Sequence, residues 1–291
     1  MSEKRPNVFI VGAPKAGTTY LYTVLQEHPE LFFPKVKELN HFSYDDLTTY
    51  GYYKDFKLQS EQKYLKQYVN AYNQKHLVDA SVSYFAFASV PEKIARFNPN
   101  AKILISLRNP IKRAFSHYQM DQRMGYAPEP FNIYIHRKKE DPYFIQYIQN
   151  SLYYENIQNF LKHFKRENIH ILFLERMEEE FSGVFDFLNI PQKQNKENSR
   201  DPVNVNKAPR NRIARFFQHN RKVVSTLKMV IPKSVIQRYN KYLYKTAETA
   251  EIDQQSAEFL TNLFAKDIQS LSELLDIDLF DLWQIKPNTH V

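Results

Sequence analysis

Short apolar runs alternate with amphipathic stretches along the first two thirds of the chain. Apolar runs of five or six residues that end in turn residues are typical of buried strands, and apolar positions that repeat every three or four residues are typical of helices. The predicted strands span residues 7–12, 31–33, 76–79, 102–107 and 169–174. Strands that alternate with helices in this way predict an α/β fold, with a central parallel sheet flanked by helices.

Helices are predicted between these strands and after the last of them. They span residues 18–28, 62–72, 91–97, 109–124, 151–165, 177–188 and 253–275. Residues 125–145 lack a clear period and are predicted to be irregular. No linker divides the chain, so we predict one domain over residues 1–291. Its sheet and ligand site fall within about 7–190, and a basic loop-and-helix segment with the C-terminal helices falls within about 198–291.

The composition is that of a globular protein with a sizeable core. Hydrophobic residues make up 43% and charged residues 25% of the 291 residues, which is ordinary for that class. There is no cysteine, so a disulfide scaffold, a thiolate metal site and a cysteine nucleophile are excluded. No apolar run approaches the roughly 18–20 residues that span a bilayer, and no signal-peptide pattern is visible. We therefore expect a cytoplasmic protein without a membrane span.

Charge is distributed unevenly along the chain. The net charge of +8 suits an anionic ligand, nucleic acid or a membrane surface. Residues 200–246 carry twelve Lys and Arg against one acidic residue, whereas residues 247–291 carry nine acidic residues and two lysines. The basic stretch is either a ligand-binding surface or one of two segments that screen each other, and the sequence leaves both open.

The first predicted strand runs into a glycine-bearing loop, GAPKAGTT, at residues 12–19. Glycines let backbone N–H groups converge on an anion, and the helix that follows adds the positive end of its dipole. Gly12, Gly17 and Thr19 keep the spacing of the G-x-x-x-x-G-K-[ST] nucleotide loop, but Thr18 stands where that pattern has lysine. Lys15 supplies a cation inside the loop instead. The loop therefore predicts a phosphate site and argues against an ATPase or kinase.

A second candidate phosphate contact follows the strand at residues 102–107. Arg108 comes at the carboxyl end of that strand, and Ser116 lies on the next predicted helix. In an open α/β sheet both positions can face the ligand crevice. Arg108 as a bidentate donor and Ser116 as a hydroxyl donor can together hold a second phosphate.

These motifs resemble those of a known family. Residues 14–19, PKAGTT, are similar to the 5′-phosphosulfate loop of sulfotransferases that use 3′-phosphoadenosine 5′-phosphosulfate (PAPS), and residues 108–116 are similar to their 3′-phosphate motif R-[DN]-P-x-x-R-x-x-S. Both motifs occur in the order and at the separation of the family. The resemblance is closest to the bacterial and heparan-sulfate-type carbohydrate sulfotransferases. It extends over nearly the whole chain, through Lys37-Glu38, residues 151–154, residues 169–174 and Leu282-Trp283.

The resemblance implies a P-loop-like fold and an enzyme that moves a sulfuryl group from PAPS to a hydroxyl by in-line transfer, with no metal. It implies that Lys15 stabilises the leaving phosphate and that Glu38 is the general base. His41 is a rival base, since other branches of the family use histidine, and His41 and Tyr84 are candidate acceptor contacts. The residues implied to bind PAPS are Lys15, Ala16, Gly17, Thr18, Thr19, Arg108, Ser116, Lys207 and Arg210.

The chain departs from the family pattern at two places. Ala80 stands where the pattern E-K-T-P-x-Y often has lysine, which removes a cation expected near the reaction centre, and Lys37 is a candidate substitute. Residues 207–210 correspond to a late basic loop of the family but lack its Lys-Gly-Arg sequence. The resemblance favours a glycan as the acceptor, while a tyrosyl, phenolic or lipid hydroxyl stays open, as does the oligomeric state.

Two other functions compete with this hypothesis. A P-loop nucleotide kinase or NTPase would need a lysine at residue 18 and an acidic magnesium ligand at the end of a later strand. A non-enzymatic nucleic-acid-binding protein would use the basic stretch at 200–246, although we expect no nucleic-acid partner. Lys112 and Arg113 are predicted to lie on an exposed helix face, and His117 and His163 are predicted to be structural.

Overall fold

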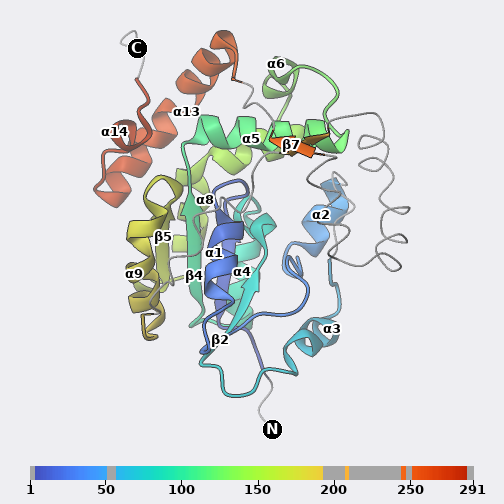
Figure 1. Cartoon of the computed structure of the whole chain (residues 1–291), viewed down its shortest axis with the longest axis vertical. Coiled ribbons are helices and arrows are strands. Elements are labelled where there is room, and N and C mark those ends of the chain that lie inside the picture. The colour runs from blue at the N-terminus through green and yellow to red at the C-terminus, as the bar shows by residue number, and fades with distance from the viewer. Residues whose placement is uncertain (1–3, 51–56, 193–206, 210–243, 247–250, 287–291) are drawn as a thin grey trace.

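The computed structural model describes residues 4–50, 57–192, 207–209, 244–246 and 251–286 (Figure 1). Five parallel strands form the central sheet in the order β2-β3-β1-β4-β5. The strands are β1 Val8–Gly12, β2 Leu31–Phe32, β3 His76–Ala80, β4 Lys102–Leu107 and β5 Ile169–Phe173. The predicted α/β fold with a central parallel sheet is confirmed, and each predicted strand is present.

Both faces of the sheet are buried under helices. Alternate residues of a strand point to opposite faces. Accordingly, Val8 and Ile10 of β1 belong to one apolar cluster with residues of α1 (Thr18–Leu25) and α9 (Met177–Leu188), whereas Phe9 and Val11 belong to a second cluster. The second cluster includes residues of α4 (Ser89–Phe97), α8 (Tyr153–Leu161) and α13 (Gln254–Leu275). Burial on both sides explains why the strands are continuously apolar in sequence.

The remaining described elements are shorter, apart from one long helix. They are α2 Tyr44–Tyr50, α3 Glu61–Leu65, η1 Lys66–Tyr68, η2 Val82–Phe85, α5 Pro110–Met124, α6 Phe131–Ile135, α7 Pro142–Tyr147, η3 Gln149–Ser151, η4 Arg166–Asn168, η5 Leu174–Arg176, β6 Lys207–Pro209, β7 Tyr244–Thr246 and α14 Leu279–Trp283. The short helices α2 and α14 were not predicted, and α4 begins two residues before the predicted start at Pro91.

Residues 125–145 contain two helices, α6 and α7, so the prediction of an irregular segment there is wrong. In α6, Phe131, Tyr134 and Ile135 are buried at helical spacing. In α7, the Asp141 side chain accepts a hydrogen bond from the Tyr143 N–H at 2.8 Å, and Pro142 is the first helical residue. A capping Asp followed by Pro is a helix-start signal, but helices of five or six residues are too short to display a period.

The long helix α5 crosses the end of the sheet and is fixed at its start (Figure 1). The Asn109 side chain accepts hydrogen bonds from the N–H groups of Ile111 and Lys112, each at 3.0 Å. Its amide also donates to the carbonyl oxygen of Trp283 in α14 at 2.9 Å. The predicted start of a helix at Asn109-Pro110 is thus confirmed, and its cap also joins α5 to the C-terminal helices.

The strand order defines where a ligand crevice can form. From β1 the chain passes to β2 and β3 on one side, and then crosses β1 to form β4 and β5 on the other side. Parallel sheets bind ligands beyond the carboxyl ends of the strands at such a reversal of direction. The loops that follow β1, β3 and β4 are therefore the expected walls of a site.

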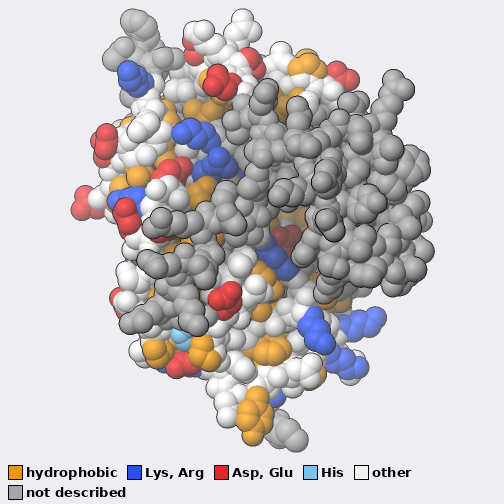
Figure 2. All heavy atoms as spheres, viewed as in Figure 1, with side chains coloured by type: hydrophobic (Ala, Val, Ile, Leu, Met, Phe, Trp, Pro, Cys, Tyr) orange, Lys and Arg blue, Asp and Glu red, His pale blue; other side chains and the backbone are white. Residues whose placement is uncertain are grey.

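Within the part of the chain that the structure describes, no helix is both long and apolar enough to cross a membrane. Among the same residues, no group of three His, Asp or Glu side chains is arranged to hold a metal ion. On the face seen in Figure 2, the described basic, acidic and hydrophobic side chains are interspersed in small groups.

Candidate active site

A cavity of about 700 Å³ lies beyond the carboxyl ends of β1, β3 and β4. This volume is within the range of about 300–1,000 Å³ that is usual for ligand sites. Several residues predicted from the sequence to bind the donor or to take part in the reaction line this one cavity. They are Lys15, Gly17, Thr18, Thr19, Glu38, Arg108 and Ser116.

The loop after β1 is held against β4. The Ala13 N–H donates to the carbonyl oxygen of Ser106 at 2.7 Å, and the Ser106 hydroxyl donates to the carbonyl oxygen of Ala16. Gly17 has a φ of 84°, and a Cβ there would lie only 2.6 Å from Leu174 Cδ1. Thr18 and Thr19 form the first turn of α1, so the free N–H groups of that turn lie at the cavity. Ala16, also predicted to bind the donor, is buried and does not line the cavity, and its N–H donates to the carbonyl oxygen of Ala13 at 3.2 Å.

Lys15 is the cation of this loop. Its φ of 69° is in the left-handed region, which residues other than glycine seldom adopt. Its Nζ lies 3.7 Å from Sδ of Met120 on α5. Burial, together with the positive charges of Arg123 and Arg108, lowers the pKa of Lys15 to about 8. A bound anion would stabilise this partly buried ammonium group, which lies among other cations.

Arg108 and Ser116 complete what we call the anion-binding end of the cavity, which comprises Lys15, Gly17, Thr18, Thr19, Arg108 and Ser116. Arg108 follows β4 directly, and its Nη1 donates to the carbonyl oxygen of Lys15 at 3.2 Å. The Tyr153 hydroxyl donates to the carbonyl oxygen of Arg108 at 2.8 Å. The two phosphate motifs, about a hundred residues apart in sequence, are therefore in direct contact.

The prediction that Arg113 lies on an exposed helix face is wrong, although Lys112 beside it is exposed. Arg113 is fully buried beneath the cavity. Its guanidinium donates to Ser151 Oγ at 2.6 Å, to the carbonyl oxygens of Gln146 and Tyr147 at 2.7 and 2.8 Å, and to that of Pro14 at 3.5 Å. Arg113 therefore ties the phosphate loop to α7 and η3, and a step of one residue along α5 separates this buried position from the exposed Lys112.

His117, one turn after Arg113, lines the cavity as well. Its Nδ1 lies 3.2 Å from Nη1 of Arg113. Because arginine can only donate, this nitrogen accepts and the ring is neutral. Burial and then the charges of Arg113 and Lys15 lower the pKa of His117 well below its usual value. The predicted structural role fits this contact, but the sequence did not reveal that the ring also faces the cavity.

Glu38 reaches the cavity from the segment that follows β2. It has a φ of 61°, and Asn40 has a φ of 50°. The Glu38 N–H donates to the carbonyl oxygen of Ala80 at 3.1 Å. Lys37 Nζ lies 3.6 Å from Glu38 Oε1 and donates to Thr19 Oγ1 at 3.2 Å. Lys37 thus joins this carboxylate to the phosphate loop, and Lys15 and Glu38 share an uncommon backbone conformation of the kind that concentrates at functional sites.

A buried carboxylate, Asp79 at the end of β3, holds the Glu38 segment in this conformation. It accepts hydrogen bonds from the hydroxyls of Tyr64 at 2.8 Å, Ser81 at 2.6 Å and Tyr84 at 2.9 Å. Burial raises the pKa of Asp79, and these hydrogen bonds oppose that shift. Ser81 Oγ in turn accepts from the Asn40 N–H at 3.1 Å.

The two predicted acceptor contacts, His41 and Tyr84, do not line the main cavity. Tyr84 is fully buried, and its hydroxyl oxygen accepts from the His41 N–H at 3.0 Å. The His41 ring stacks on Tyr64 at 4.4 Å, its Nδ1 lies 2.6 Å from the carbonyl oxygen of Leu58, and it lines a separate, smaller cavity beside Lys93. Both residues therefore shape the segment that carries Glu38.

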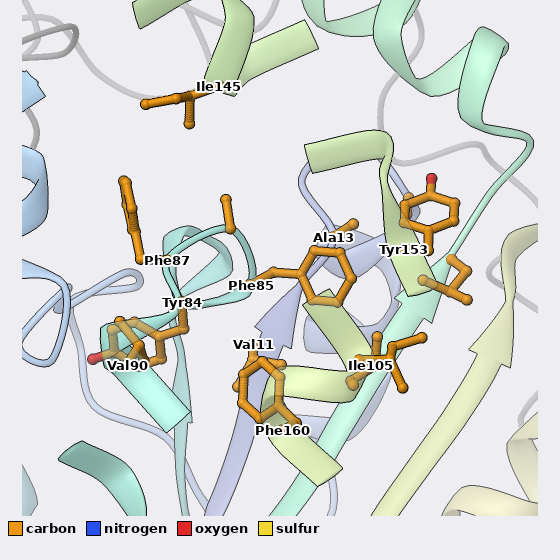
Figure 3. Packing of buried hydrophobic residues seen from close by; sticks show 14 of the residues in the cluster. Val11, Ala13, Tyr84, Phe85, Phe87, Val90, Ile105, Ile145, Tyr153 and Phe160 are labelled. Carbon is orange, nitrogen blue, oxygen red and sulfur yellow. The ribbon is translucent and has the colours of Figure 1, made fainter. Parts of the chain in front are cut away.

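Apolar side chains line part of the same cavity, beside polar residues such as Gln146 and Asn150. What we call the apolar wall consists of Leu47 of α2, Val82 of η2, Ala86 and Phe87 after η2, Met120 of α5 and Ile145 of α7. Figure 3 shows Phe87 and Ile145 pointing into the same space, above the turn that carries Tyr84 and Phe85. These residues come from four separate elements and the segment after η2, and no motif in the sequence indicated them.

Two predicted donor contacts cannot be located by their side chains. Arg210 lies outside the described residues, as does most of the basic stretch at 200–246. For Lys207 the structure gives the backbone, which pairs with Thr246 in the antiparallel pair β6 and β7. Their role at the nucleotide stays a prediction. Besides Arg113, the sequence missed Ser83 at the cavity, although the second arginine of R-[DN]-P-x-x-R-x-x-S was a signal for Arg113.

The chain is similar to known proteins in sequence and in fold. The family described as "Sulfotransferase domain" matches residues 5–255. Human heparan sulfate glucosamine 3-O-sulfotransferase 5 is 27% identical over 205 residues, covering 65% of this chain and 55% of that protein. The bifunctional heparan sulfate N-deacetylase/N-sulfotransferase 1 of Caenorhabditis elegans is 29% identical over 119 residues, covering 39% of this chain and 13% of that protein. The matches thus span about half or less of these curated relatives.

A solved structure has a similar fold along nearly its whole length. The crystal structure of a sulfotransferase from Alicyclobacillus acidocaldarius aligns with a TM-score of 0.68, covering 96% of this chain and 99% of that one. The sequence identity is 23%. The likeness therefore concerns the fold, including the sheet that carries the cavity.

Proposed function

The chain belongs to the sulfotransferase domain family, and from this premise we propose that it is an enzyme that transfers a sulfuryl group from PAPS to a hydroxyl acceptor. The observation that carries the proposal is the anion-binding end, where two phosphate motifs meet in one cavity with a partly buried ammonium and a guanidinium. A ligand with phosphates at both its 5′ and 3′ positions needs two such contacts.

The residues of the anion-binding end fit the donor. Loop N–H groups around Gly17, the first turn of α1 and the ammonium of Lys15 would hold the 5′-phosphosulfate. Arg108 and the hydroxyl of Ser116 would hold the 3′-phosphate. Charged hydrogen bonds of this kind are short and strong in a buried site. When bound, PAPS supplies the sulfuryl group and a phosphate leaving group.

The protein's own contribution is positioning and charge stabilisation, as in phosphoryl transfer. Glu38 accepts the proton from the acceptor hydroxyl. Lys15, already inside the loop, provides positive charge where negative charge builds up on the leaving phosphate. Lys37, between Thr19 and Glu38, keeps the carboxylate close to the loop.

Glu38 is a better candidate for the base than His41. Glu38 lines the cavity, whereas one ring nitrogen of His41 is engaged with the carbonyl oxygen of Leu58 and the ring stacks on Tyr64. A general base must be within hydrogen-bond reach of the proton it removes. This assignment rests on geometry and on the resemblance noted in the sequence.

For the acceptor, the names of the curated relatives support the predicted carbohydrate, since they refer to glucosamine and heparan sulfate. A sugar hydroxyl would be deprotonated by Glu38 in the same way as any other hydroxyl. The chemistry of the base therefore does not by itself choose the acceptor.

The direct test is transfer of label from ³⁵S-PAPS to a mixed panel of hydroxyl compounds, with binding of the product 3′-phosphoadenosine 5′-phosphate (PAP) measured by calorimetry. We expect PAP to bind far more tightly than ATP, because Thr18 replaces the lysine that an ATP loop uses. ATP-dependent transfer without PAP binding would favour the kinase or NTPase alternative. A salt-sensitive gel shift with DNA or RNA, again without PAP binding, would favour the nucleic-acid-binding alternative.

A further inference from the structure

The peptide unit that follows Arg108 is held on both sides by side chains from other elements. Its carbonyl oxygen, that of Arg108, accepts from the Tyr153 hydroxyl at 2.8 Å, and its N–H, that of Asn109, donates to Glu175 Oε1 at 2.9 Å. Tyr153 is the first residue of α8 and is fully buried, and Glu175 lies in η5. Because the conformation of a side chain depends on its backbone, these two contacts restrict where the guanidinium of Arg108 can point.

Tyr153 is itself held in place by α13. The N-cap residue of α8 is Leu152, whose side chain makes no capping hydrogen bond, so the N–H groups of the first turn need other acceptors. The Asp267 carboxylate on α13 accepts from the N–H of Tyr153 at 2.8 Å and from that of Tyr154 at 3.1 Å. A carboxylate there also interacts favourably with the positive end of the helix dipole. Asp267 therefore fixes the turn of α8 from which Tyr153 reaches Arg108.

Asp267 carries its charge under ordinary assay conditions. Burial raises its pKa to about 6, and the hydrogen bonds from the N–H groups of Tyr154 and Tyr153 oppose that shift. Above that pH the carboxylate is ionised, and the ionised form can only accept hydrogen bonds. α13 packs against α8 (Figure 1), and the Tyr153 ring contacts Trp283 of α14 with 5.9 Å between the ring centroids. The helices α13 and α14 thus support Tyr153 through its backbone and through its ring.

We propose that Tyr153 and Asp267 are positioning residues for the contact between Arg108 and the 3′-phosphate. This rests on the proposed sulfotransferase function, in which Arg108 holds that phosphate. Neither Tyr153 nor Asp267 lines the cavity, so both act through Arg108 and not on the ligand. The packing of α13 on α8 thereby determines how strongly the protein prefers a 3′,5′-bisphosphate to a 5′-monophosphate.

The physical reason is the geometry of the hydrogen bond that Arg108 would donate. Such bonds weaken steeply as the donor angle departs from linearity, and a charged pair loses more than a neutral one. A small rotation of the peptide after Arg108 would therefore weaken the 3′-phosphate contact. The contacts to the 5′-phosphate come from the loop at residues 12–19 and do not use the guanidinium, so they should persist.

The first test measures binding of PAP and of adenosine 5′-monophosphate (AMP) by calorimetry at pH 7.5, with the full chain. Tyr153→Phe removes only the hydroxyl, so PAP affinity should fall about 3–10-fold while AMP affinity stays within about twofold. In turnover, the KM for PAPS should rise by the same factor, with kcat changed by less than about twofold. Tyr68→Phe is the matched control, because its fully buried hydroxyl also donates to a backbone carbonyl oxygen, that of Val78.

The second test changes the carboxylate on α13. Asp267→Asn keeps the shape and one accepting oxygen but loses the charge, so PAP affinity should fall about 2–5-fold. Asp267→Ala removes both accepting oxygens and should lower it about 3–10-fold. Asp253→Asn is the control, because Asp253 accepts from the Ser256 N–H at the start of α13 itself, about 21 Å along the helix from Asp267. This control should keep the wild-type ratio of PAP to AMP affinity.

A double-mutant cycle with Arg108→Ala separates positioning from general destabilisation. The Arg108→Ala protein keeps the backbone carbonyl that Tyr153 contacts but lacks the guanidinium. If Tyr153 and Asp267 act through that guanidinium, adding Tyr153→Phe or Asp267→Asn to Arg108→Ala should weaken PAP binding no further.

Three results would overturn the proposal while the sulfotransferase function stands. They are an unchanged PAP affinity in Tyr153→Phe, equal losses for PAP and AMP, and the same loss of PAP affinity whether or not Arg108 is present. A different result would remove the function itself. If the wild type binds PAP no more tightly than AMP and transfers no sulfuryl group from PAPS, the proposed function fails and the positioning roles fail with it.

Discussion

The anion-binding end and the apolar wall share one cavity but are built in different ways. The anion-binding end comes from two short segments, residues 12–19 and 108–116, and uses backbone N–H groups, two cations and hydroxyls. The apolar wall comes from α2, η2, the segment after η2, α5 and α7, and each of them contributes one or two side chains. Recognition of an anion can be encoded locally, because a glycine turn and a helix start suffice. Recognition of an apolar group needs surfaces from several elements.

The largest expected effect is on the base at the junction of the two regions. Glu38→Gln removes the proton acceptor but keeps the shape, so turnover should fall about 10²–10⁴-fold. PAP affinity should stay within about twofold, since the phosphate contacts are intact. Steady-state kinetics and calorimetry measure the two quantities separately.

His41→Asn serves as the comparison for Glu38→Gln. A larger loss of turnover in His41→Asn than in Glu38→Gln would contradict the assignment of the base. It would also mean that the smaller cavity beside Lys93, and not the main cavity, contains the reaction centre.

The next largest effect is expected for Lys15, the lysine of the anion-binding end. Lys15→Ala should lower turnover about 10²–10³-fold, which is the usual loss when one stabilising group of a developing negative charge is removed. It should weaken PAP binding as well, because Lys15 is one of the two cations of the anion-binding end. Unchanged PAP binding in a folded Lys15→Ala protein would refute the assignment of this loop as a phosphate site.

A variant of Arg108 distinguishes the contact to the 3′-phosphate from the contact to the 5′-phosphate. Arg108→Ala should weaken PAP binding about 10–100-fold, as expected for loss of a charged hydrogen bond. Binding of adenosine 5′-monophosphate, which lacks the 3′-phosphate, should change little. Calorimetry with both nucleotides gives the ratio, and equal losses for the two would argue against a 3′-phosphate contact.

The lowered pKa of Lys15 predicts how PAP affinity depends on pH. Below its pKa of about 8 the free protein already carries the ammonium, so affinity should be nearly constant there. Above that pH, binding of the anion requires proton uptake by Lys15, so affinity should fall by up to about tenfold per pH unit. Titrations from pH 6.5 to 9.5 in buffers of different ionisation enthalpy measure this uptake, and a Lys15→Met variant that kept the same slope would assign it elsewhere.

The smallest effect is expected from the hydrogen bonds to the buried carboxylate of Asp79, which supports the segment that carries Glu38. Tyr84→Phe removes the hydroxyl that donates to Asp79 and accepts from the His41 N–H. Turnover should fall about 2–10-fold, the equivalent of one hydrogen bond, with PAP affinity unchanged. Tyr68→Phe is the control, because its hydroxyl donates to the carbonyl oxygen of Val78 and does not contact the Glu38 segment. Equal effects on kcat in both variants would indicate a structural role only.

The sequence was informative where the relevant physics is local. The strands and the start of α5 at Asn109-Pro110 followed from apolar runs and capping chemistry, and Lys15 and Arg108 followed from loop motifs next to strands. It was uninformative for α6 and α7, since five or six residues do not display a period. It was misleading for Arg113, because a charged residue on an amphipathic helix is usually solvated, and only the packing of α7 and η3 reveals its partners.

The sequence alone was enough to predict the parallel sheet and a phosphate-binding loop, because contiguous residues specify both and their backbone geometry is set locally. The tertiary structure decided which groups share the cavity. It brought Glu38 into the cavity and turned His41 toward Leu58 and Tyr64. It also assembled the apolar wall, since packing brings together side chains that are distant in sequence and no local pattern specifies which of them will meet.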